Sequence, residues 1–163
     1  MVMGVASCGK TSVGEVLAAR LAATFIEGDR LHPKANVERM SAGIPLTDDD
    51  RWPWLSQVGA SLQGRDGRIA SCSALKRAYR EHIVAKAGRP VAFVFLDGAK
   101  GLLEQRIAAR EGHFMPASLL ASQLATLQRP AADERAKAFD IGRPVDEIVA
   151  EASAWLLHLQ EQS

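Results

Sequence analysis

The chain has 163 residues, of which 47% are hydrophobic and 24% are charged, a composition typical of one soluble globular domain. Lysine and arginine number 20 and aspartate and glutamate 19, so the net charge of +1 gives no reason to expect a nucleic-acid partner. No apolar stretch reaches the roughly 18 residues that span a bilayer. With only two cysteines and no recognisable signal peptide, we expect a cytoplasmic protein without a membrane partner.

Short apolar runs alternate with amphipathic stretches along the chain. The apolar runs predict strands at residues 2–5, 24–27, 69–72, 91–96 and 138–141. Helical spacing of apolar residues predicts helices at 10–23, 33–42, 50–62, 75–87, 99–110, 116–128 and 144–160. This alternation predicts an α/β fold with a mostly parallel sheet and helices on both faces. We expect a single domain, 1–163, with a substrate-binding segment at about 30–65 and a small lid at about 110–128.

The first motif follows the first predicted strand and fits G-x-x-x-x-G-K-[ST], a phosphate-binding loop that opens a helix. Its glycines let backbone N–H groups turn inward toward phosphate oxygens, and the helix adds its positive end. Lys10 is expected to act in catalysis by neutralising the β- and γ-phosphates of ATP, and the Thr11 hydroxyl is expected to hold Mg²⁺. An ordinary glycine turn is the alternative. The residues expected to bind the nucleotide are Gly4, Val5, Ala6, Ser7, Cys8, Gly9, Lys10, Thr11 and Ser12.

A second group of polar residues follows the second predicted strand, where ligands of open parallel sheets bind. The Asp29 carboxylate could accept a hydroxyl proton from a substrate or hold Mg²⁺ through water, and its alternative role is to cap the next helix. His32 could contact substrate or only pack at the start of that helix.

Cys8 in the first motif could be a reactive thiol, but we expect it to contribute its backbone.

The third group begins with three acids, Asp48 to Asp50, which we interpret as helix caps rather than as a metal cluster. Arg51 is a candidate for holding a substrate carboxylate through two parallel hydrogen bonds. Trp52 and Trp54 are expected in the core or in a pocket wall.

The fourth group follows the third predicted strand. Ser73 and the next helix N-terminus offer donors to a polyol or an acid. Lys76, Arg77 and Arg80 add positive charge, and the alternative for these three residues is a solvated basic helix face.

A fifth group lies between two predicted helices and is typical of a mobile lid. Arg110, with Arg106 behind it, could stabilise charge on the transferring phosphoryl group. His113 could contact substrate or lie on the lid surface. A plain connection between two helices is the alternative for the whole segment.

In this order, the five groups resemble the gluconate kinase (gluconokinase) family, in the shikimate kinase-like group of P-loop kinases. The distinctive strings are EGD-x-LHP at 27–33, N-x-x-x-M-x-x-G-x-P-L-x-DDDR-x-PWL at 36–55, SCSALKR-x-YR at 71–80, R-x-GHF at 110–114 and LQ-x-P-x-x-DE within 123–134. One departure is Ser7-Cys8, where the family usually has Gly-Ser.

The resemblance implies ATP-dependent phosphorylation of D-gluconate at its 6-hydroxyl, giving 6-phospho-D-gluconate and ADP, with Mg²⁺. It also implies a three-layer P-loop kinase fold with a five-stranded parallel sheet of order 2-3-1-4-5, and a homodimer. By analogy, Asp29 would orient or deprotonate the acceptor hydroxyl, while Arg51 and the segment from Ser73 to Arg77 would hold gluconate. Two alternatives stay open: a related kinase that phosphorylates shikimate or a nucleotide, and a catalytically silent ATP-binding module.

Overall fold

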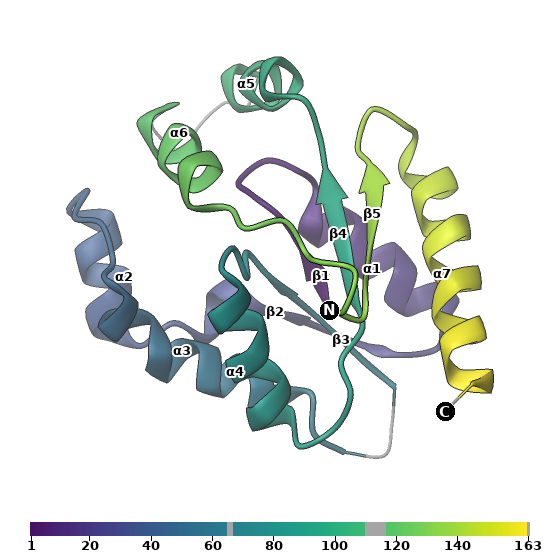
Figure 1. The fold of residues 1–163 in the computed structure, drawn as a ribbon. Helices are drawn as coiled ribbons and strands as arrows, with labels where there is room; N and C mark the ends of the chain where they lie inside the picture. The colour runs from purple at the N-terminus through teal and green to yellow at the C-terminus, as the bar shows by residue number, and fades with distance from the viewer. Residues whose placement is uncertain (65–66, 110–116, 163) are drawn as a thin grey trace.

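The computed structural model describes residues 1–64, 67–109 and 117–162. Five parallel strands form one sheet in the order β2-β3-β1-β4-β5, as the resemblance implied (Figure 1). The strands are β1 (Val2–Met3), β2 (Thr24–Glu27), β3 (Arg68–Cys72), β4 (Phe93–Asp97) and β5 (Ala136–Asp140).

Helices cover both faces of this sheet, as predicted from the alternation of elements (Figure 1). They are α1 (Lys10–Arg20), the short 3₁₀ helix η1 (Gly28–Leu31), α2 (Lys34–Ser41), α3 (Asp48–Ser61), α4 (Arg77–Ala87), α5 (Lys100–Ala108), α6 (Ala117–Thr126) and α7 (Val145–Glu161). Adjacent strand residues point to opposite faces, so the sheet separates two buried cores. Val94 packs in the core beneath α1 and α7, while Phe95 packs in the core beneath α3 and α4.

Among the element boundaries that differ from the predicted ones, three have a local backbone reason. Strand β1 ends before Gly4, whose φ of +147° departs from strand geometry. Helix α3 begins at Asp48 because Thr47 and Asp50 form a capping box, in which the Asp50 N–H donates to Thr47 Oγ1 (3.2 Å). This box confirms Asp50 as a capping residue. Helix α4 begins two residues later than predicted, since Ala74 has a φ of +44° in the left-handed region.

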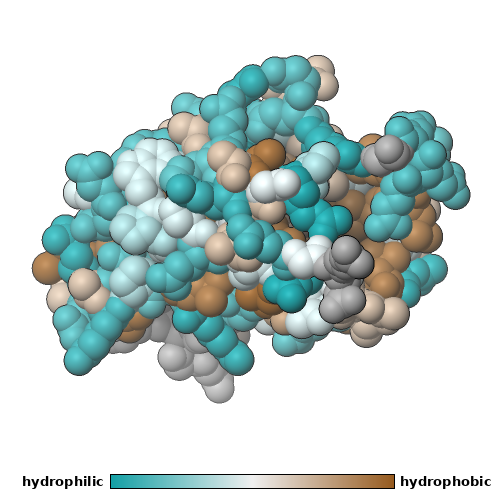
Figure 2. All heavy atoms as spheres, turned by 90° about the horizontal axis from the view of Figure 1, so that it is seen from below, coloured by the Kyte–Doolittle hydropathy of each residue, from teal (hydrophilic) through white to brown (hydrophobic). Residues whose placement is uncertain are grey.

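Because all five strands are parallel, their carboxyl ends meet at one edge of the sheet, and the first four predicted motifs gather there (Figure 1). Near the opposite edge lies a cavity of about 440 Å³ lined by Met1, Leu62, Val91 and Leu156. The face seen from below has hydrophobic groups set between hydrophilic ones (Figure 2). Among the residues that the structure describes, no helix has the length and hydrophobicity needed to cross a bilayer.

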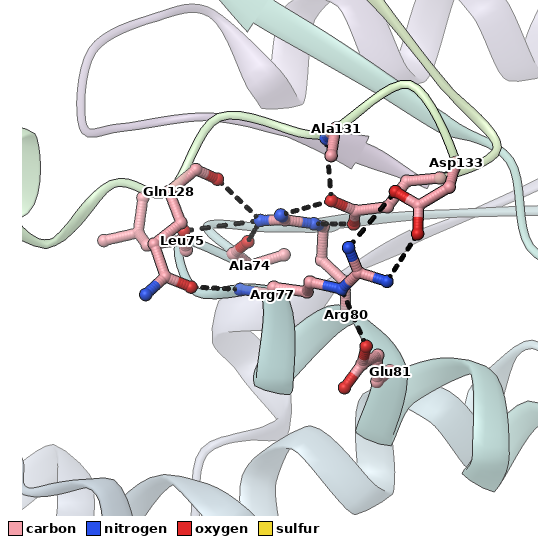
Figure 3. A network of polar contacts seen from close by, with 9 residues as sticks. Ala74, Leu75, Arg77, Arg80, Glu81, Gln128, Ala131 and Asp133 are labelled. Atoms are coloured by element: carbon pink, nitrogen blue, oxygen red, sulfur yellow. Dashed lines mark hydrogen bonds and ion pairs between the residues drawn. The ribbon is translucent and has the colours of Figure 1, made fainter.

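Arg80 is a buried structural residue and not part of a solvated basic face. Its side chain is 1% exposed and pairs with the Glu134 carboxylate through Nε and Nη2. Its Nη1 donates to the carbonyls of Ala74 (3.0 Å), Leu75 (3.3 Å) and Gln128 (3.0 Å), as Figure 3 shows. The expectation that Arg80 adds charge for substrate is therefore wrong, because these five contacts occupy its guanidinium group inside the protein.

Replacing Arg80 by methionine removes the partner of a mostly buried carboxylate. We expect Arg80→Met to lower the free energy of unfolding by about 3–5 kcal/mol, measured by urea denaturation. The matched control is Arg77→Met, because Arg77 is 44% exposed and pairs with Asp133 and Glu81 near the surface. That change should cost about 1 kcal/mol or less. Equal costs for the two variants would contradict the structural role of Arg80.

Candidate active site

The phosphate-binding loop runs from Gly4 to Thr11 between β1 and α1. Gly9 is the N-cap of α1 with a φ of +95°, a conformation that favours glycine. The Lys10 ammonium group donates to the carbonyls of Gly4 (3.1 Å) and Val5 (2.9 Å), so it lies across the loop. The first turn of α1, whose residues are all described, holds no acidic side chain, so its positive end is available to an anion.

Cys8 is buried in this loop, with 1% of its surface exposed. A Cβ atom at Gly4 would lie 2.7 Å from the Cys8 Sγ and 2.8 Å from the Leu96 carbonyl oxygen, so only glycine fits there. Burial raises the pKa of the Cys8 thiol above its ordinary value, while Lys10 and Arg106 oppose that rise. A protonated, buried thiol is a poor nucleophile, which supports the expectation that Cys8 contributes its backbone.

The Thr11 hydroxyl reaches a carboxylate that we did not predict as a site residue. Thr11 Oγ1 donates to Glu27 Oε2 at 2.5 Å, and Ser71 Oγ donates to Glu27 Oε1. The Gly28 N–H donates in turn to Ser71 Oγ (3.1 Å), which joins the end of β2 to β3. The signal that could have identified Glu27 is its place as the last residue of a strand, at the edge where the phosphate loop lies.

Asp29 and His32 lie on and just after η1, beyond Glu27. Asp29 is exposed, and the N-cap of α2 is Pro33, so Asp29 does not cap that helix. The His32 ring stacks on Trp54, with centroids 4.0 Å apart and planes 14° apart. Trp54 is buried and donates from Nε1 to the Gly28 carbonyl (2.8 Å), in keeping with its predicted place in the core or a pocket wall.

The protonation of His32 follows from its neighbours. Burial lowers the pKa of the ring below its ordinary value, Arg51 lowers it further, and Asp29 opposes this shift. Asn36 Nδ2 donates to the Asp50 carbonyl (2.7 Å) and lies 3.4 Å from His32 Nδ1. With Nδ1 as acceptor, the neutral ring carries its proton on Nε2. His32 can therefore offer an N–H donor to a hydroxyl or carboxylate.

Arg51 and Lys76 meet at the N-termini of α3 and α4, around a carboxylate that we predicted only as a cap. Asp48 accepts from Lys76 Nζ (2.6 Å) and from the Tyr79 hydroxyl (2.5 Å), and Arg51 Nη1 lies 3.6 Å from its Oδ1. Lys76 and Tyr79 hold the pKa of Asp48 below its ordinary range. This Asp48 cluster, formed by Asp48, Arg51, Lys76 and Tyr79, contains two cations and one carboxylate.

Arg77 turns away from the Asp48 cluster. Its guanidinium makes two hydrogen bonds to Asp133 (2.7 and 3.1 Å) and one to Glu81 (2.8 Å), as Figure 3 shows. Ser73 is half-buried just beyond β3, at the same edge of the sheet. The predicted lid residues Arg110 and His113 lie outside the described residues.

Comparisons with known proteins agree with this geometry. Residues 1–130 match the protein family described as AAA domain. A gluconokinase from Gluconobacter oxydans is 52% identical over an alignment of 138 residues that covers 82% of this chain and 77% of that protein. The thermosensitive gluconokinase of Escherichia coli is 44% identical over 139 residues, covering 83% of this chain and 74% of that protein.

Among solved structures, a gluconokinase from Sinorhizobium meliloti superimposes with a TM-score of 0.91 and 52% identity, covering 99% of this chain and 92% of that chain. An adenylylsulfate (APS) kinase from Mycobacterium tuberculosis, at 21% identity and a TM-score of 0.66, shares the fold alone. The family match, over residues 1–130, includes the segments that carry the phosphate loop, Asp29 and the Asp48 cluster. The chain therefore belongs to the gluconokinase family of P-loop kinases.

Proposed function

We propose that this chain transfers the γ-phosphoryl group of ATP to the 6-hydroxyl of D-gluconate, giving 6-phospho-D-gluconate and ADP. The observation that carries the proposal is the Thr11–Glu27 hydrogen bond, which puts the phosphate loop beside the strand end that leads to Asp29 and His32. A nucleotide site and a polar acceptor site then share one edge of the sheet. The 52% identity to a gluconokinase supports gluconate as the acceptor.

Gluconate combines a carboxylate with a row of hydroxyls, and the residues of this edge suit both. The Asp48 cluster offers Arg51 and Lys76 to the carboxylate, since the two cations outnumber its one acid. His32 offers an N–H to a hydroxyl, and Asp29 offers an acceptor. We also assign Ser73 and Arg77 to the substrate side on the resemblance alone, and His113 on its place in the predicted lid.

The mechanism follows from positioning and charge rather than from covalent chemistry. Asp29, exposed on η1, orients the acceptor hydroxyl and accepts its proton as the oxygen attacks the γ-phosphorus. Lys10 and the inward N–H groups of the loop stabilise the charge that develops on the phosphoryl oxygens. Arg110 of the lid is proposed to add positive charge at the same place.

Mg²⁺ fits the oxygen donors found beside the loop. It prefers hard oxygen ligands and keeps several waters, so it needs few protein groups besides the phosphates. The Thr11 hydroxyl and the Glu27 carboxylate lie 2.5 Å apart and supply such donors, and Asp29 is close in sequence. We propose that these residues hold Mg²⁺ directly or through water. When bound, the ion supplies charge neutralisation to the phosphates.

We further propose that the protein is a homodimer in the cytoplasm. This part of the proposal rests on the family resemblance and on the composition. Turnover of shikimate or a nucleotide, and nucleotide binding without transfer, are the competing functions.

The decisive experiment is an acceptor screen in which ADP release is coupled to a spectrophotometric signal. We expect turnover with ATP and gluconate, and none above background with shikimate or AMP. Turnover with shikimate or AMP alone would replace the proposed acceptor. ADP binding without any acceptor-dependent turnover would favour the silent module.

Asp29→Asn keeps the size of the side chain and removes its basicity. We expect kcat to fall by about 100-fold or more, while the KM for gluconate changes much less, because general base catalysis acts in the transition state. The matched control is Glu161→Gln, where an exposed carboxylate at the opposite, C-terminal end of α7 is likewise replaced by its amide. A kcat equal to that of the control would remove Asp29 from the mechanism.

The His32 ring should titrate below its ordinary pKa of 6.5, because burial removes water from the charged imidazolium. An NMR titration can measure this, with the resonance assigned by His32→Asn and with the urea-unfolded chain as reference. Since the unfolded state binds the proton more tightly, the folded state should lose stability as the pH falls through the unfolded pKa. A midpoint at or above the unfolded value would contradict the stacked, neutral ring.

A further inference from the structure

One hydrogen bond joins the phosphate loop to α6, a helix within the segment 110–128 that we predicted as a lid. The backbone N–H of Ala6, the third residue of the loop, donates to Oε1 of Gln123 at 2.6 Å, across 117 positions of sequence. A backbone N–H can only donate, so the group that faces Ala6 must be the carbonyl oxygen of the Gln123 amide. Nothing in the reaction proposed above uses this contact.

The stretch from Gln123 to Gln128 is itself firmly attached to the acceptor side. Gln128 donates its backbone N–H to the Leu75 carbonyl (2.8 Å), and its Oε1 accepts from the backbone N–H of Arg77 (2.8 Å; Figure 3). Its own carbonyl accepts from the buried Arg80 (3.0 Å). These contacts hold the stretch against the N-terminus of α4, next to Lys76 of the Asp48 cluster.

Helix α6 and the residue that follows it, Leu127, also pack into the core beneath α1. Leu120 is 1% exposed, and Leu124 and Leu127 are partly buried against the same core as Val13 and Leu17 of α1. Gln123 lies on this anchored helix face, and the Leu127 N–H donates to the Gln123 carbonyl (2.9 Å). Gln123 therefore projects from a fixed support and can hold the start of the loop in place.

We propose that Gln123 is a positioning residue for phosphoryl transfer, which fixes the phosphate loop relative to the acceptor-binding side through its hydrogen bond to Ala6. Transfer requires the attacking oxygen and the phosphorus to approach within about 3–3.5 Å, and a misplacement of about 1 Å can cost 100-fold in rate. The stretch from Gln123 to Gln128 spans the loop and the start of α4, so it sets that separation. This role rests on the proposed function.

The test is Gln123→Met, which keeps the length of the side chain and removes the acceptor. We expect kcat to fall by about 10-fold to 100-fold, with the KM values for ATP and gluconate within about threefold of wild type. The dissociation constant of ADP should also stay within about threefold, because the amides at the start of α1 remain. The matched control, Gln105→Met on the exposed surface of α5, should leave kcat unchanged.

Two results would overturn the proposal. A kcat within twofold of wild type would make the Ala6 bond a structural contact only. A loss of ADP affinity as large as the loss of kcat would show that the loop had collapsed rather than moved. If Gln123→Met does not fold, Gln123→Asn carries the test, since its side chain is one methylene too short to reach Ala6 and the same fall in kcat is expected.

The experiment also separates this proposal from the proposed function. If the wild-type chain does not phosphorylate gluconate, the proposed function fails, and the ratio of variant to wild-type kcat is measured with the acceptor that the screen identifies. If no organic acceptor supports turnover, the ratio is measured for transfer to water. In each case a variant kcat within twofold of the wild-type kcat overturns the role of Gln123.

Discussion

The buried ion pair between Arg80 and Glu134 holds the segments that form the carboxyl edge of the sheet. The guanidinium of Arg80 binds two carboxylate oxygens on one side and three backbone carbonyls on the other, from Ala74, Leu75 and Gln128. A planar fork with five donors satisfies this set, which a lysine could not do. The start of α4 and the segment after α6 are thus held together although 48 positions separate Arg80 from Gln128.

This arrangement specifies geometry more than it adds stability. Burying a charged pair costs desolvation that its attraction only partly offsets, so an apolar replacement of both partners could be as stable. An apolar contact, however, would leave the Leu75 and Gln128 carbonyls without this donor and the turn at Ala74 without support. Ala74 has a left-handed φ of +44°, which is unfavourable for a residue with a Cβ atom. The hydrogen bond from Arg80 stabilises that turn, and the turn places Lys76 beside Asp48.

Whether a feature could be predicted from the sequence depends on how many positions separate the residues that produce it. The phosphate loop follows from residues a few positions apart, so its spacing was sufficient. The Thr47–Asp50 capping box is equally local, but we predicted only capping acids there and placed the start of the helix two residues late. The strand order required the family resemblance. Glu27 and Gln123 were missed because their partners lie 16 and 117 positions away. The prediction for Arg80 was wrong because the sequence pattern of a basic residue on a helix is the same whether its side chain faces water or a buried carboxylate.

The charge distribution of the site also differs from what the near-neutral composition suggests. Arg51, Lys76 and Arg77 were all predicted to meet the substrate, and each lies beside a protein carboxylate. The ratio of positive to negative charge differs between the two places. Asp48 is paired with two cations, whereas Arg77 is paired with two carboxylates, Asp133 and Glu81. An incoming anion gains most where positive charge is in excess. We therefore expect the gluconate carboxylate to bind at the Asp48 cluster, and Arg77, already paired with two carboxylates, to contribute less to its binding.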